Sequence, residues 1–83
     1  MNIAQIVLTE LQTIVTEHTP FVIEVDELTL LEELHLESLA FTSLIVALET
    51  RIGFIPSPIL QGMDFPESVG ELIAMYEREK ALS

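Results

Sequence analysis

The chain has 83 residues, 49% of them hydrophobic, and its 14 acidic residues against three basic ones give a net charge of −11. A charge of this sign repels nucleic acid and anionic membranes and favours basic protein surfaces. The chain contains no cysteine, which excludes disulfides, thiolate metal sites and a cysteine nucleophile. We expect one domain over residues 1–83, monomeric and with a packed apolar core. No apolar run is long enough to cross a bilayer and no signal peptide is evident, so we expect a cytoplasmic protein without membrane insertion.

Residues 2–17 predict a helix, because apolar residues recur on one face from Ile3 to Val15. The next segment, residues 21–37, is irregular. We expect a long ordered loop there, since a single strand would have no partner. Its apolar residues are expected to plug the helical bundle, namely Phe21, Val22, Val25, Leu28, Leu31 and Leu34. Six acids without a base lie between Glu24 and Glu37, and they indicate either a solvated loop or a partner-binding surface.

A second helix is predicted from Ser38 to Ile52, ending at Gly53. We expect it to bury Leu39, Leu44, Ile45, Leu48 and Ile52, with Phe41 either in the core or on the surface. Residues 54–62 are interrupted by two prolines and predict a loop with one short helical turn. Two capping-box spacings precede the last helix, and Ser68 with Glu71 is favoured over Asp64 with Glu67. The buried stripe of that helix is Val69, Leu72, Ile73 and Tyr76. Arg78 and Lys80 are expected in its final turn, and Glu77, Glu79 and Ala81-Leu82-Ser83 are expected to fray.

Ser38 is the candidate functional residue, because it lies where the acidic segment ends and the apolar helix begins. Its hydroxyl can cap the helix. A phosphodiester attached to the same oxygen would lie against the positive end of the helix dipole. His35 precedes Ser38 by three residues, but no oxyanion-hole signature accompanies the pair, so we expect no catalysis. His18 and His35 do not predict a metal site.

The residues Glu37-Ser38-Leu39, followed by Leu44, Ile45, Leu48 and Glu49, resemble the Asp-Ser-Leu segment of acyl carrier proteins and the helix that follows it. The order and spacing of the elements extend this resemblance over nearly the whole chain. In that family the serine carries a 4′-phosphopantetheine arm, donated by coenzyme A, whose thiol holds an acyl group as a thioester. The resemblance implies an all-α, four-helix fold with three main helices and one short one. It also implies a carrier of acyl or aminoacyl intermediates in fatty-acid, polyketide or specialised-metabolite biosynthesis. The chain begins with Met and ends soon after its last helical pattern, so we expect a free-standing carrier.

The resemblance assigns the arm to Ser38 and a role in transferase recognition to Glu37, which stands where the family usually has Asp. The expected docking surface surrounds Leu39, Phe41, Thr42 and Ile45, and it is more apolar than the acid-studded helix of the family. The implied partners are a phosphopantetheinyl transferase, an acyl-loading ligase or transferase, and synthase-type enzymes with basic or apolar docking patches. A different interpretation stays open: an unmodified acidic helical adaptor or inhibitor that binds a basic partner, with Ser38 serving only as a helix cap.

Overall fold

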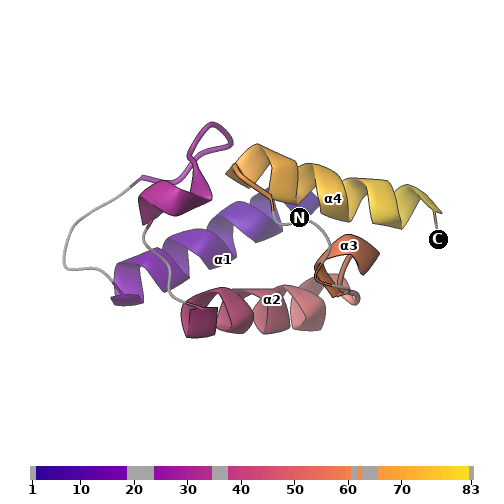
Figure 1. Ribbon diagram of the computed structural model, residues 1–83, viewed down its shortest axis with the longest axis horizontal. Helices are drawn as coiled ribbons and strands as arrows, with labels where there is room; N and C mark the ends of the chain where they lie inside the picture. Colours follow the sequence, from indigo (N-terminus) through magenta and orange to yellow (C-terminus); the bar gives the residue numbers. More distant parts are fainter. Residues whose placement is uncertain (1, 19–23, 35–37, 61, 63–65, 83) are drawn as a thin grey trace.

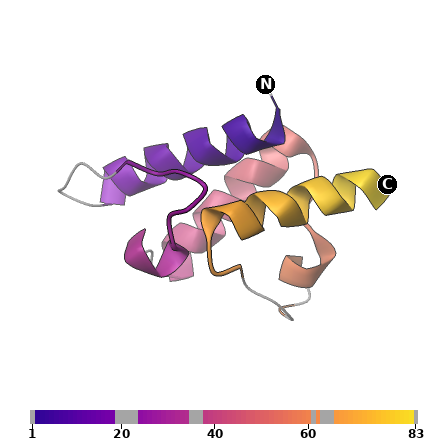
Figure 2. The same ribbon diagram turned by 90° about the horizontal axis from the view of Figure 1, so that it is seen from above.

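A computed structural model describes residues 2–18, 24–34, 38–60, 62 and 66–82. Within these ranges the protein has no strand and consists of α1 (Ile3–His18), a 3₁₀ helix η1 (Leu31–Leu34), α2 (Ser38–Ile52), α3 (Ser57–Leu60) and α4 (Val69–Leu82). Figure 1 shows α2 below α1 and α4, and Figure 2 shows from above that α1 and α4 lie side by side over α2. α1 packs against both of the other long helices. The all-α prediction is confirmed, as are the short helix and the three long ones.

The core lies between the three long helices and is closed at one end by η1. Val7, Leu11 and Val15 of α1 are fully buried, which confirms the helical stripe. Burying each side chain of this size stabilises the fold by about 1.5–3 kcal/mol before the entropy of ordering it is counted. The other residues of the apolar core are Ile3 and Ile14 of α1, Leu34 of η1, Ala40, Leu44, Ile45 and Leu48 of α2, and Val69, Leu72, Ile73 and Tyr76 of α4.

The prediction that Leu39 is buried is wrong, since its side chain is 79% exposed. The inward row of α2 runs through Ala40, Leu44 and Leu48, which are spaced four residues apart on one face. Leu39 precedes Ala40 by one residue and is therefore turned away from that row. The small Ala40 is only 6% exposed, and the larger leucine lies outside. Phe41 is half-buried and packs against the core.

The connection between α1 and α2 fills the core at some positions and not at others. Leu34 is fully buried, and Val25 and Leu31 pack partly against the core. Leu28 is 87% exposed, so the expectation that it plugs the bundle is wrong. Leu31 and Leu34 are carried inward by η1, whereas Leu28 precedes it in a turn. Phe21 and Val22 lie outside the described residues.

Backbone hydrogen bonds join this connection to the beginning of α4. The amide of Val69 donates to the carbonyl of Thr29, and the amide of Gly70 donates to that of Glu27, both at 2.9 Å. The amide of Leu31 donates to the carbonyl of Glu67, also at 2.9 Å. A Cβ atom at position 70 would lie 3.0 Å from the Glu27 carbonyl oxygen, so glycine permits this close approach. We call these three bonds the loop–α4 junction.

The end of α2 and the start of α4 lie at the residues predicted for them, and the C-terminal end of α4 is the exception. Gly53 ends α2 at a φ of 107°, a region that glycine adopts without strain, and its amide donates to the Glu49 carbonyl at 2.8 Å. At the start of α4 the amide of Glu71 donates to Ser68 Oγ at 3.1 Å, which confirms Ser68 as the cap. Asp64, the rejected alternative, lies outside the described residues.

The exception is the C-terminal segment, because α4 continues to Leu82, whereas the sequence predicts fraying of Glu77, Glu79 and residues 81–83. Glu79 Oε1 accepts hydrogen bonds from the Ser57 hydroxyl at 2.6 Å and from the Ser57 amide at 3.2 Å. This contact joins the last turns of α4 to the first residue of α3. It gives α4 a tertiary partner beyond the end of its apolar stripe, and Ser83 alone of the segment lies outside the described residues.

Candidate functional site at the start of α2

The candidate attachment residue, Ser38, is the first residue of α2. Glu37 and His35 lie outside the described residues, and of Ser38 only the backbone is described. The first backbone N–H groups of a helix lack intrahelical partners and carry the positive end of its dipole. The first turn of α2 contains no acidic residue. A phosphate ester on Ser38 would therefore meet free donors there without a carboxylate in the same turn.

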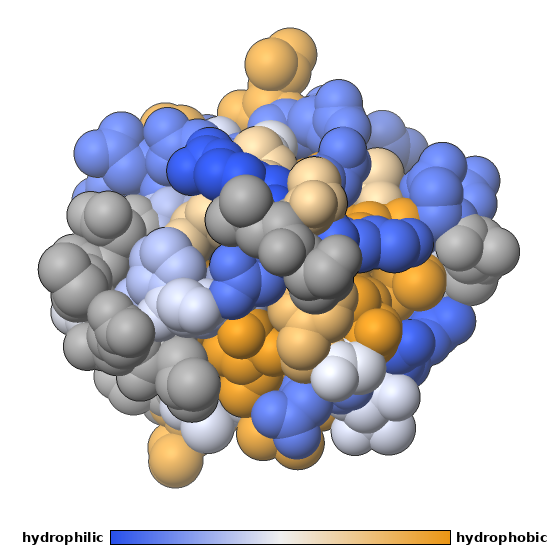
Figure 3. Space-filling model, turned by 90° about the vertical axis from the view of Figure 1, so that its right-hand side faces the viewer, coloured by the Kyte–Doolittle hydropathy of each residue, from blue (hydrophilic) through white to orange (hydrophobic). Residues whose placement is uncertain are grey.

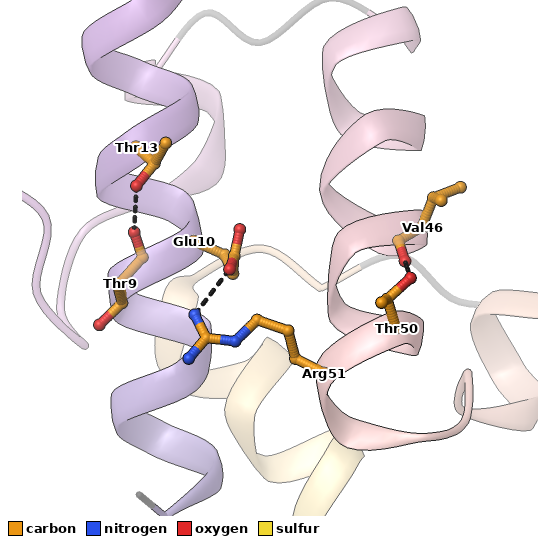
Figure 4. Close-up of polar contacts among 6 residues, drawn as sticks. All are labelled: Thr9, Glu10, Thr13, Val46, Thr50 and Arg51. Carbon is orange, nitrogen blue, oxygen red and sulfur yellow. Dashed lines mark hydrogen bonds and ion pairs between the residues drawn. The ribbon is translucent and has the colours of Figure 1, made fainter.

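One face of α2 is exposed and uncharged. Leu39 and Val46, which are 79% and 56% exposed, share this face with Thr42, Ser43 and Thr50. The spacing of three, four and seven residues from Leu39 places them in one row along the helix. No charged residue occurs between Ser38 and Leu48, and the Thr50 hydroxyl donates back to the Val46 carbonyl at 3.1 Å (Figure 4). We call this row the neutral face of α2.

The four residues expected around the docking surface do not all lie on the neutral face. Leu39 and Thr42 are exposed, and Phe41 is half-buried. Ile45 is only 7% exposed and belongs to the core, so it is not part of a surface. Its spacing of three residues from Leu48 places it on the buried side of the helix. Val46 and Ser43, which the sequence reasoning did not select, are exposed and complete the face.

The far end of α2 is tied to α1 by an ion pair. Arg51 Nη1 lies 2.7 Å from Glu10 Oε1, and Figure 4 shows the two side chains meeting between the helices. Exposed pairs of this kind contribute roughly 0.2–1 kcal/mol, so this one helps to orient α2 more than it stabilises the fold. In the same view the Thr13 hydroxyl of α1 donates to the Thr9 carbonyl at 3.0 Å. The pairing between Glu10 and Arg51 was not predicted, because the two residues are 41 positions apart.

Tyr76 of α4 brings a hydroxyl into the core. Its side chain is fully buried, and the hydroxyl has no hydrogen-bond partner among the residues that the structure describes. Burial, and secondarily the negative charge of Glu49, raises the pKa of Tyr76 to about 12. Its ring lies 5.6 Å from that of Phe54, between the centroids. The sequence predicted that Tyr76 is buried but not that its hydroxyl lacks a partner among the described residues. The indication in the sequence was that Tyr76 is the one residue with a polar group in the apolar stripe of α4.

The end of the bundle at α3 has a partly open apolar surface. Phe54, Ile55 and Ile59 are half-buried and pack against the core. Figure 3 shows this end of the molecule, where apolar atoms reach the surface between hydrophilic ones. These side chains lie beyond the C-terminal end of α2, at the opposite end of that helix from Ser38.

Other kinds of site find little support in the described part of the chain. No group of three or more His, Asp or Glu residues in these ranges could hold a metal ion. None of the described helices combines the length and apolar character needed to span a membrane. The predicted absence of catalysis stays a prediction, because His35 and the side chain of His18 are not described.

Comparisons of the chain with family models, with curated proteins and with solved structures give no match. The function is therefore argued from the residues of this chain, and above all from the beginning of α2.

Proposed function

We propose that the protein is an acyl carrier protein and that Ser38 is the residue that carries its 4′-phosphopantetheine arm. The observation that supports this most directly is that α2 begins at Ser38, immediately after an acidic segment and ahead of a neutral exposed face. The succession of a long helix, a long connection, a helix beginning with serine, a short helix and a last helix also agrees with the resemblance.

In a carrier mechanism the protein itself performs few chemical tasks. When attached, the arm supplies a thiol that holds an acyl group as a thioester, and this chemistry belongs to the cofactor. The backbone at the start of α2 would hold the phosphate, through its free N–H groups and the helix dipole. Tethering the acyl group raises its effective concentration at an enzyme that has docked on the carrier.

The neutral face of α2 determines which enzymes can dock near the arm. An enzyme that reaches Ser38 approaches over the exposed Leu39 and, one and two turns further on, over Ser43 and Val46. Because this face carries no charge before Glu49, we infer a docking patch that is apolar close to the arm. Basic residues on the enzyme would then be placed further out, toward the acids of the other elements.

The test is an intact-mass measurement before and after incubation with coenzyme A and a broad-specificity phosphopantetheinyl transferase. The parent protein and Ser57→Ala should each gain one phosphopantetheinyl group, and Ser38→Ala should gain none. Ser57 is the matched control, because it is an exposed serine that lies outside the neutral face of α2. A carrier protein of known competence shows that the transferase is active.

If the folded parent gains no group, either Glu37 prevents recognition by the broad-specificity transferase or Ser38 is only a helix cap. The variant Glu37→Asp distinguishes these two explanations. Uptake by Glu37→Asp alone would show that a dedicated transferase reads the longer carboxylate at position 37. Failure of both proteins, or equal uptake by Ser38→Ala, would refute the assignment of the arm to Ser38. Failure of both would favour the unmodified acidic adaptor instead.

A further inference from the structure

A turn in the connection between α1 and α2 holds two leucines at the surface. Leu28 is 87% exposed and Leu30 is 45% exposed. A single exposed leucine is ordinary on a protein surface. Here two large apolar side chains lie two residues apart in a short segment, residues 26–30, which we call the leucine turn.

Hydrogen bonds fix the shape of the leucine turn. Asp26 Oδ1 accepts from the Leu28 amide at 2.9 Å and from the Thr29 hydroxyl at 3.1 Å. The Thr29 amide donates to the Asp26 carbonyl at 3.1 Å. The loop–α4 junction then fastens both sides of the turn to the bundle through the carbonyls of Glu27 and Thr29. Leu28 is therefore held outward by an ordered backbone and is not part of a loose end.

The charges around the two leucines all have one sign. The exposed acids on the connection are Glu24, Asp26, Glu27, Glu32 and Glu33, and Glu67 and Glu71 follow at the start of α4. The loop–α4 junction and the pairing of Leu30 with Ser68 bring these two segments together. Residues 24–34 and 66–74 contain no Lys or Arg. The charged residues of these two segments, which carry and adjoin the exposed leucines, are therefore all carboxylates.

The leucine turn lies across the bundle from the neutral face of α2. In Figure 1 the turn is at the upper edge of the molecule and α2 is at the lower edge, with α1 between them.

We propose that the leucine turn is a docking surface for a protein that presents apolar side chains flanked by Lys or Arg. Leu28 and Leu30 supply the apolar contact, whose burial gives affinity. The surrounding carboxylates attract a cationic partner and orient it. The same charges exclude a second copy of this chain, an anionic membrane and a nucleic acid, each of which would bring like charge to the acids. This proposal does not depend on the carrier function of Ser38.

The test uses three synthetic helical peptides and the full chain labelled for backbone amide NMR. The first peptide has leucines on one face with flanking lysines. The second keeps the lysines and replaces the leucines with serine, and the third keeps the leucines and replaces the lysines with glutamate. We expect the first peptide to shift the amides of the leucine turn and of the start of α4, and the other two to bind at least about tenfold more weakly.

Leu28→Ser should weaken binding of the first peptide about tenfold, because it removes the most exposed apolar side chain. Val46→Ser is the matched control, since it removes an exposed apolar side chain on the other side of the bundle and should leave this binding unchanged. Both positions are exposed, so both variants should keep the helical circular dichroism spectrum of the parent.

Several results would overturn the proposal. One is that the first peptide shifts only amides of α2, and another is that no peptide shifts any amide. The proposal is also refuted if Leu28→Ser binds the first peptide as tightly as the parent does, or if the serine peptide binds as tightly as the first peptide. Equal binding of the serine peptide would show attraction by the acids alone.

Discussion

Replacing Tyr76 by phenylalanine should stabilise the protein. The hydroxyl is buried and has no partner in the described part of the chain, so folding removes its hydrogen bonds to water without replacement. Leaving a buried donor unpaired costs about 1–3 kcal/mol. Phenylalanine removes that cost and keeps the ring that packs 5.6 Å from Phe54, while the missing oxygen leaves a small void. We expect a net gain of about 1 kcal/mol in the free energy of unfolding, which raises Tm by about 4–8 °C in a domain of this size.

Urea denaturation followed by far-ultraviolet circular dichroism measures this change, with thermal melting as a second readout. Tyr76→Leu is the control, because it removes both the hydroxyl and the ring and should destabilise the protein through lost packing. A loss of 1 kcal/mol or more in Tyr76→Phe would refute the reasoning, because it would mean that the hydroxyl makes a stabilising hydrogen bond in the folded state.

Three further predictions concern charge and capping. Tyr76 is the only tyrosine and tryptophan is absent, so tyrosinate absorbance reports this group alone and should titrate near a pKa of about 12 in place of the ordinary 10.0. Because the folded pKa is the higher one, the unfolded chain loses its proton first, and stability should be complete below pH 10.0 and fall as the pH rises toward about 12; a folded protein that titrates near 10.0 would contradict the burial of the hydroxyl. Ser68→Ala should lower the free energy of unfolding by about 1 kcal/mol in urea denaturation, and Ser43→Ala should leave it unchanged, whereas equal effects would show that Ser68 does not act as a cap. Added NaCl or MgCl₂ should raise Tm, since ions screen the repulsion within a chain of net charge −11, and a flat response would show that the acids are already compensated.

Local sequence patterns predicted the elements whose causes are themselves local. The four-residue and three-residue spacing of the apolar residues in α1 and α4 determines which face is buried, and Ser68 and Gly53 act within one turn of the helix ends that they define. For α2 the pattern was ambiguous, because both Leu39 and Ala40 could begin an apolar row. Hydrophobicity favoured Leu39, whereas the structure buries Ala40 and leaves Leu39 exposed.

The features that were not predicted depend on contacts between residues far apart in the sequence. Leu28 is exposed because its turn is fastened to α4, and the last turns of α4 are helical where Glu79 meets Ser57. The spacing of apolar residues along the sequence carries no information about these long-range contacts. For the candidate site, the sequence correctly predicted that a helix starts at Ser38. The exposed face of that helix was identified only from the structure, in which Ile45 is buried and Ser43 and Val46 are exposed.

The loop–α4 junction has a consequence for the order in which the protein matures during synthesis. Its donors and acceptors lie about 40 positions apart, and contacts of such separation form late in folding. A nascent chain that has not yet reached Glu67 lacks the carbonyl that receives the Leu31 amide and the amides that Glu27 and Thr29 accept. Residues 27–31 therefore obtain their hydrogen bonds to the start of α4 only after Gly70 has been synthesised. An enzyme that recognises this segment together with Ser38 would act only after Gly70 has been added and not on a shorter growing chain.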